Sequence, residues 1–148
     1  MIDVLKVTKK ILFKEFHRIA RENGVKLNIK SMLGGWYCIT ENKISINRNA
    51  RKQALPFMFF HELGHLHCCK NNIWKNYHNW SSDTWKGYKS TALKAEKWID
   101  LWAEKEVNKY FKNVDSYKPY HTKEGVKEFK KTVDSIYYNY WILTHKKH

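Results

Sequence analysis

The sequence predicts an α+β fold, in which a short antiparallel sheet packs on a helix that carries two histidines and on further helices. Apolar residues recur at helical spacing in several segments, whereas residues 26 to 47 contain short runs typical of strands, divided by Gly and Asn turns. The chain has 148 residues and no internal stretch rich in Pro, Gly or Ser. We therefore expect a single domain, 1–148, built around one core.

The first segment, residues 3–23, is expected to form a scaffold helix that packs on the sheet. Asn23-Gly24 follows it and is typical of a helix C-terminal cap. The apolar stripe that predicts this helix consists of Val4, Leu5, Ile11, Leu12, Phe16 and Ile19.

Three short strands are expected within residues 26–47, separated by turns at Gly34-Gly35 and Glu41-Asn42. We assign the last of them, Lys43 to Asn47, to an edge of the sheet. An edge strand can hold an extended peptide by backbone pairing, so this strand is either a substrate-binding edge or an ordinary one. Cys38, in the middle strand, is expected to be a small buried residue.

The fourth segment, residues 53–69, is predicted to be a largely buried helix that carries His61-Glu62-Leu63-Gly64-His65. Two imidazoles four residues apart on a helix point the same way and can bind one metal ion. Glu62 can then take a proton from a water molecule and return it. Burying two histidines and a glutamate without partners would be costly, so a metal is the simpler explanation. The pattern therefore predicts a zinc-dependent (Zn2+) hydrolase, most simply a peptidase.

A catalytic zinc site needs a third protein ligand besides His61 and His65. The plan HExxHxxGxxH is excluded, since Cys68 and Asn71 stand where Gly and His are required. A later helix, expected over 91–111, offers Glu96 as a ligand, with Asp100 one turn on to accept the free ring N–H of a ligand histidine.

Two other interpretations of these residues stay open. Cys68 is a rival third ligand, and a Cys/His-rich site would be closed and structural rather than catalytic. Glu96 and Asp100 would be an ordinary solvated helix face if no metal is bound.

The remaining segments are an aromatic loop over 71–90 and a C-terminal helix over 122–144. The loop either forms one wall of the cleft or caps the core with aromatic side chains. It also offers three candidate donors for an oxyanion, Tyr77, His78 and Tyr88, among which the sequence does not select.

These elements together resemble the ImmA/IrrE family of small metallopeptidases. The resemblance runs from Gly34 to Ala103 and includes Gly35-Trp36-Tyr37, the motif from Phe60 to Leu66, and Ala95-Glu96 through Asp100-Leu101-Trp102-Ala103. It implies a zincin-like fold, His61, His65 and Glu96 as zinc ligands, and Glu62 as the general base. It also implies cleavage of a specific intracellular protein, such as a repressor or other regulator of a phage or mobile element. After Ala103 the chain departs from the family's pattern.

The charge supports a rival function. The chain carries 28 Lys and Arg against 14 Asp and Glu, a net charge of +14 that is typical of proteins binding nucleic acid. The alternative is therefore a basic nucleic-acid-binding or regulatory module with a structural or vestigial metal site. We favour a solvated surface, because the lysines are spread along the chain and no recognition motif is present. The charge could also steer acidic protein partners or place the enzyme near a DNA-bound regulator.

The expected compartment is the cytoplasm. Charged residues interrupt the apolar positions of residues 1–20, so we predict neither a signal sequence nor a membrane span there. Three cysteines, two of them adjacent, make a poor disulfide framework and suit a reducing compartment.

Overall fold

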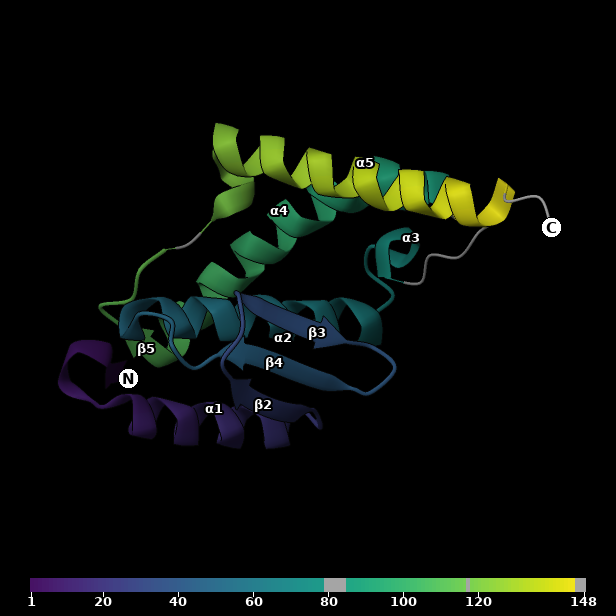
Figure 1. Cartoon of the computed structure of the whole chain (residues 1–148). Coiled ribbons are helices and arrows are strands. Elements are labelled where there is room, and N and C mark those ends of the chain that lie inside the picture. Colours follow the sequence, from purple (N-terminus) through teal and green to yellow (C-terminus); the bar gives the residue numbers. More distant parts are fainter. Residues whose placement is uncertain (79–84, 117, 146–148) are drawn as a thin grey trace.

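The computed structural model describes residues 1–78, 85–116 and 118–145, and over these it is a mixed α+β fold (Figure 1). α1 and α2 pack side by side against a three-stranded sheet, and α4 and α5 lie on the other side of α2. The helices are α1 (Lys9–Glu22), α2 (Leu55–Lys70), α3 (Lys75–His78), α4 (Trp85–Tyr110) and α5 (Lys123–His145). Single 3-10 turns occupy Val4–Lys6, Lys52–Ala54 and Pro119–His121.

The three-stranded sheet is mixed rather than antiparallel, which corrects the sequence prediction. Its strands are β2 (Lys26–Lys30), β3 (Gly35–Cys38) and β4 (Lys43–Asn47), in the order β2-β4-β3. β4 runs parallel to β2 and antiparallel to β3. The predicted edge strand β4 is therefore the central strand. In keeping with that place it is the most buried of the three strands, with Ile44 and Ile46 fully buried.

The N-terminal segment is not one helix over 3–23. A short strand β1 (Ile2–Asp3) pairs in parallel with β5 (Phe111–Lys112), and α1 starts only after Thr8, whose side chain accepts a hydrogen bond from Ile11 N. As a result the predicted stripe is divided. Val4, Leu12, Phe16 and Ile19 are buried, whereas Leu5 and Ile11 are exposed.

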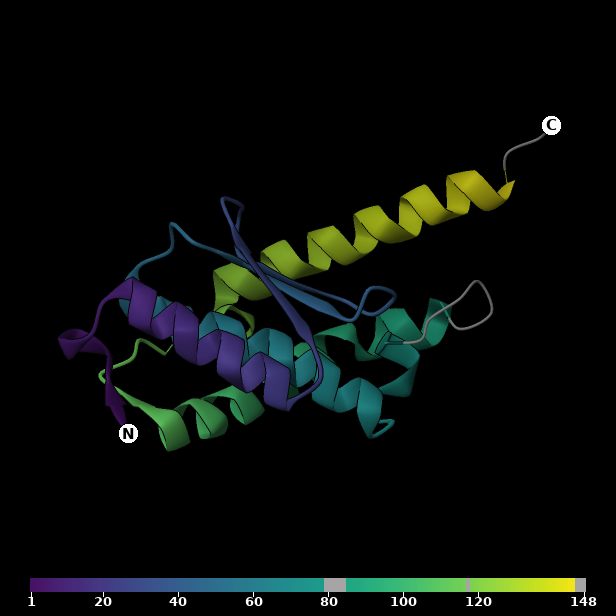
Figure 2. The same cartoon turned by 90° about the horizontal axis from the view of Figure 1, so that it is seen from below.

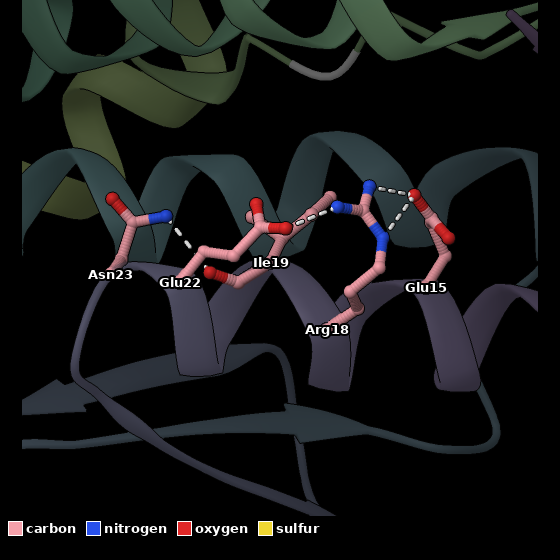
Figure 3. A network of polar contacts seen from close by, with 5 residues as sticks. All are labelled: Glu15, Arg18, Ile19, Glu22 and Asn23. Carbon is pink, nitrogen blue, oxygen red and sulfur yellow. Dashed lines mark hydrogen bonds and ion pairs between the residues drawn. The ribbon is translucent and has the colours of Figure 1, made fainter.

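The outer face and the end of α1 are held by local polar contacts (Figure 3). Arg18 bonds to Glu15 on one side and to Glu22 on the other, at i−3 and i+4. Asn23 closes the helix, since its side-chain amide donates to Ile19 O at 2.8 Å. Gly24 follows with a φ of +67°, a conformation that glycine adopts readily, and so the predicted cap forms at this point.

The main core lies between α1, the sheet, α2 and the second half of α4. Phe16 of α1 stacks on Phe59 of α2, with ring centroids 4.8 Å apart, and meets Phe111 edge to face at 5.8 Å. Figure 2 shows α1 and α2 lying side by side, while the C-terminal half of α5 projects away from them. This core fixes α2 and therefore the motif on it.

The segment predicted as a loop over 71–90 is partly helical. α3 occupies Lys75–His78, and α4 begins at Trp85 rather than near residue 91. Asn72 and Trp74 have positive φ values of 54° and 53°, so the chain reverses sharply between α2 and α3. α3 thereby returns toward α2 and α4, both of which it contacts.

Candidate metal centre

His61, His65 and Glu96 lie together and form a group that could bind a metal ion. One ligand atom from each of these side chains lies within 4.8 Å of the other two. His61 Nε2 is 2.8 Å from Glu96 Oε2, and His65 Nε2 is 3.4 Å from Glu96 Oε1. Ligands bound at the usual zinc distances around a tetrahedral ion are about 3.3 Å apart, so the spacing suits such an ion.

Two helices supply these ligands, and a glycine lets them approach. His61 and His65 occupy one face of α2, and Glu96 comes from α4. A Cβ at Gly64 would lie 2.8 Å from Ile99 Cγ2 and 3.1 Å from Trp102 Cε3. Only glycine therefore fits at this crossing of α2 and α4. The sequence analysis did not predict that Gly64 allows this close crossing. The signal that could have indicated it was a glycine inside an apolar helix.

Asp100 lies against His61 on the side away from Glu96. Its Oδ1 is 2.8 Å from His61 Nδ1, which leaves Nε2 of the same ring facing Glu96. Asp100 is fully buried on α4, one turn after Glu96. This is the place that the Glu-x-x-x-Asp spacing assigns to a residue that orients a ligand histidine.

The acidic surroundings favour a positive charge at this centre. Burial by itself lowers the pKa of His61, but its contacts with Asp100 and Glu96 raise it to about 10. Burial raises the pKa of Glu96, yet the two histidines outweigh burial and lower it below its usual range. Within the described chain, two buried carboxylate oxygens, Glu96 Oε2 and Asp100 Oδ2, accept no hydrogen bond. A bound cation would neutralise this arrangement, so the residues fit a metal.

Glu62 occupies the same cleft, between α2 and β3. The cleft has a volume of ≈ 340 Å³, and besides Glu62 it is lined by the three ligand residues, by Gly35, Trp36, Tyr37 and Ile39, and by Tyr77 and Tyr120. Glu62 is 8% exposed, and burial raises its pKa although the neighbouring histidines oppose that rise. The backbone N–H of Tyr37 donates a hydrogen bond to it.

β3 forms the edge of the sheet beside this cleft. A Cβ at Gly35 would lie 3.0 Å from Met58 Cγ and 3.2 Å from Glu62 Cγ, so a glycine is needed where the strand passes α2. Gly34 O accepts from Asn47 N, and the antiparallel pattern then turns the N–H and C=O groups of Gly35 and Tyr37 away from β4. The strand next to the motif is therefore β3, not the predicted β4.

Two tyrosines flank the ligands. Tyr77, one of three oxyanion donors considered from the sequence, donates its hydroxyl proton to Glu96 Oε1. The side chains of the other two, His78 and Tyr88, lie outside those that the structure describes. Tyr120 stacks on His61 with ring centroids 5.7 Å apart, and sequence reasoning missed it because it follows a proline in a segment with no periodic pattern.

The cysteines lie apart from the ligand group. Cys68 is fully buried, burial raises the pKa of its thiol to about 12, and it does not belong to the group formed by His61, His65 and Glu96. The closed site that would include Cys68 therefore gains no geometric support. Cys38 is half-exposed rather than buried, which corrects the prediction for that residue.

Comparisons with known proteins found no matching family, curated protein or solved structure. Over the described residues, no helix is both long and apolar enough to cross a membrane. The case for a function therefore depends on the geometry of the centre itself.

Proposed function

We propose that this chain is a zinc-dependent peptidase of the kind that the ImmA/IrrE resemblance implies, with the zincin-like fold of that family. The observation that carries the proposal is the joint position of two histidines, Glu96 and Asp100 around one point, with Glu62 beside them in an open cleft. A structural site would need no carboxylate facing the cleft. A catalytic site needs such a carboxylate as its general base.

In this proposal His61, His65 and Glu96 hold the zinc ion, and Asp100 keeps the His61 ring in the tautomer that presents Nε2 to the metal. When bound, zinc acts as a Lewis acid and lowers the pKa of water in the site. Glu62 lines the cleft beside the three ligands, which places its carboxylate where it can accept a proton and release it again. Glu62 takes the proton from the attacking water and delivers it to the departing amine nitrogen.

The peptide substrate is proposed to lie along β3. The outward N–H and C=O groups of Gly35 and the C=O of Tyr37 can pair with an extended chain, while the Tyr37 N–H holds Glu62, which fixes the scissile bond next to Glu62. Gly35 leaves room for that approach. The edge-strand role that the sequence assigned to Lys43–Asn47 thus passes to the neighbouring strand.

Tyr77 is the proposed donor to the carbonyl oxygen as negative charge develops on it. It lines the same cleft as Glu62, and its single hydroxyl proton, donated here to Glu96, would turn to the carbonyl oxygen when substrate is bound. A donor of this kind in a water-poor site stabilises the transition state more than the ground state. Loss of one such donor typically lowers the rate by about 10²–10³-fold.

The resemblance extends the proposal to the substrate. We propose a cytoplasmic protein target, such as a repressor or another regulator of a phage or mobile element. Cleavage of a single regulator would need strong selection by the cleft and its surroundings. The surface next to the cleft is therefore as informative about the choice of substrate as the metal centre itself.

The experiment that tests the function is a map of new protein N-termini. Zinc-loaded protein and its Glu62→Gln variant are each added to a cell lysate, and new N-termini are labelled and identified by mass spectrometry. Glu62→Gln keeps the shape of the side chain but removes the base, so cleavage should fall by about 10²–10⁴-fold. Glu22→Gln, on the exposed face of α1, is the matched control and should cleave normally. New termini that persist with Glu62→Gln would contradict the proposal.

A further inference from the structure

A cationic groove lies between α4 and the first half of α5, on the side of the molecule next to the cleft. It has a volume of ≈ 440 Å³. Four lysines line it, Lys97 from α4 and three from α5, together with Tyr120, His121, Thr122 and Val126. The α5 lysines are Lys123, Lys127 and Lys130, which are spaced four and three residues apart and so share one helix face. Among the described residues, no carboxylate lines the groove.

The four lysines lack anionic partners. In the described parts of the chain none of them forms an ion pair, whereas nearby lysines do. Lys118 is 2.6 Å from Glu104, and Lys131 is 3.6 Å from Glu128. Like charges gathered in one groove repel one another, and an anionic ligand relieves that repulsion.

Tyr120 joins the groove to the metal centre. Its ring stacks on His61 and also meets Phe129 of α5 edge to face, with centroids 5.1 Å apart. The same residue lines the catalytic cleft and the groove. A chain that leaves the cleft over Tyr120 therefore enters the groove directly.

We propose that this groove binds an acidic segment of the protein substrate, on one side of the scissile bond. The inference rests on the proposed peptidase function and names the substrate class that the enzyme would select. The occupant is a peptide because the groove continues the catalytic cleft. The groove is also lined by apolar surface, from Val126, Thr122 and the Tyr120 ring, against which peptide side chains can pack. It also contains no arginine, the residue most used to contact nucleic acid phosphates and bases.

The test measures binding rather than cleavage. Fluorescein-labelled peptides are made with an apolar half and a polyglutamate half, in both orders, and each is paired with a peptide in which glutamine replaces glutamate. Binding to zinc-loaded Glu62→Gln protein is followed by fluorescence anisotropy. One of the polyglutamate peptides should bind at least about tenfold more tightly than its glutamine pair, and the preference should shrink at high salt.

Charge reversal then locates the site. In the triple variant Lys123→Glu, Lys127→Glu, Lys130→Glu the preference for the acidic peptide should disappear, while binding of the glutamine peptide stays unchanged. The matched control reverses Lys6, Lys10 and Lys14, which are exposed at the other end of the molecule and change the net charge equally. If the glutamate triple variant does not fold, the corresponding Lys→Gln triple variant replaces it.

Three results would overturn the inference. These are equal binding of the acidic and neutral peptides, equal loss in the control variant, and displacement of the acidic peptide by a tighter-binding DNA duplex of arbitrary sequence. None of them depends on cleavage. Failure of the peptidase proposal would instead appear as new N-termini that Glu62→Gln does not remove.

Discussion

The two walls of the cleft are held by apolar clusters of very different size. The main core, which backs α2 and β3, contains most of the fully buried side chains, including Phe16, Phe59 and Phe60. Among the described side chains, the cluster that carries α5 contains only Ala92 and Val133 as buried residues, with Tyr77, Phe129 and Ile136 packed partly buried against them. α4 belongs to both, because Ala92 lies in the small cluster and Ala103 in the main core.

In the proposed enzyme, this difference separates the parts that would bind metal from the parts that would meet substrate. His61, His65 and Glu62 stand on α2, which the main core fixes, and Glu96 and Asp100 stand midway along α4. Tyr77, Tyr120 and the cationic groove depend on the lightly packed side. A metal centre needs fixed ligands, whereas a substrate wall can adjust as a protein target enters.

The largest effect is expected from Phe59→Ala. Phe59 is fully buried and touches both Phe16 and Phe60, so its removal leaves a cavity in the main core. The free energy of unfolding should fall by about 3–5 kcal/mol, measured by urea denaturation. A loss of less than about 1 kcal/mol would contradict the importance given to this core.

A smaller loss is expected from Gly64→Ala. The new methyl group would meet Ile99 and Trp102, so α4 must move away from α2. We expect a loss of about 1–3 kcal/mol in unfolding free energy, together with weaker metal binding because Glu96 moves with α4. Unchanged metal affinity in isothermal titration would show that this close crossing does not position Glu96.

Phe129→Ala should affect the substrate wall more than the fold. Phe129 is only partly buried and supports Tyr120, so its truncation should lower the unfolding free energy by about 1–2 kcal/mol. Zinc content should not change, while binding of the acidic peptides should weaken. A loss of zinc would mean that the two sides of the cleft are not separable.

Thiol alkylation should show how burial differs within the main-core side, without any change in stability. The hydrogen bond with Thr40 lowers the pKa of Cys38, whereas burial raises the pKa of Cys69. Burial raises the pKa of Cys68 to about 12. A lower pKa means more thiolate at a given pH, so Cys38 should react at the lowest pH, Cys69 next and Cys68 last. Peptide mapping after iodoacetamide treatment at several pH values checks this order, and early alkylation of Cys68 would contradict it.

The centre could be predicted because its residues obey local rules. His61 and His65, like Glu96 and Asp100, are four residues apart on a helix, and that spacing alone places each pair on one face. The α+β composition of the fold followed from similar periodicity. The short strand β1 did not, because its pairing with β5 involves contacts from the other end of the chain. The late start of α1 depends on a local cap at Thr8, which the helical periodicity of residues 3–23 does not contain.

What could not be predicted depends on contacts between distant segments. The central position of β4 comes from a parallel pairing with β2, which no local pattern contains. The need for glycine at 64 exists only because Ile99 and Trp102 pack there, and Tyr120 reaches His61 only through the path of the chain after α4. Tertiary packing, rather than propensity, decides each of these.

The most direct test of the central claim is the zinc content of the purified protein by elemental mass spectrometry. The same measurement is made on Glu96→Ala, on Asp100→Asn, and on Glu106→Ala, a control on the same helix whose carboxylate pairs with Lys109. We expect about one zinc per chain, retained in Glu106→Ala, lost in Glu96→Ala, and bound about 10–100-fold more weakly in Asp100→Asn. No zinc after reconstitution at neutral pH would contradict the peptidase, and zinc retained unchanged in Glu96→Ala would point instead to a structural site that includes Cys68.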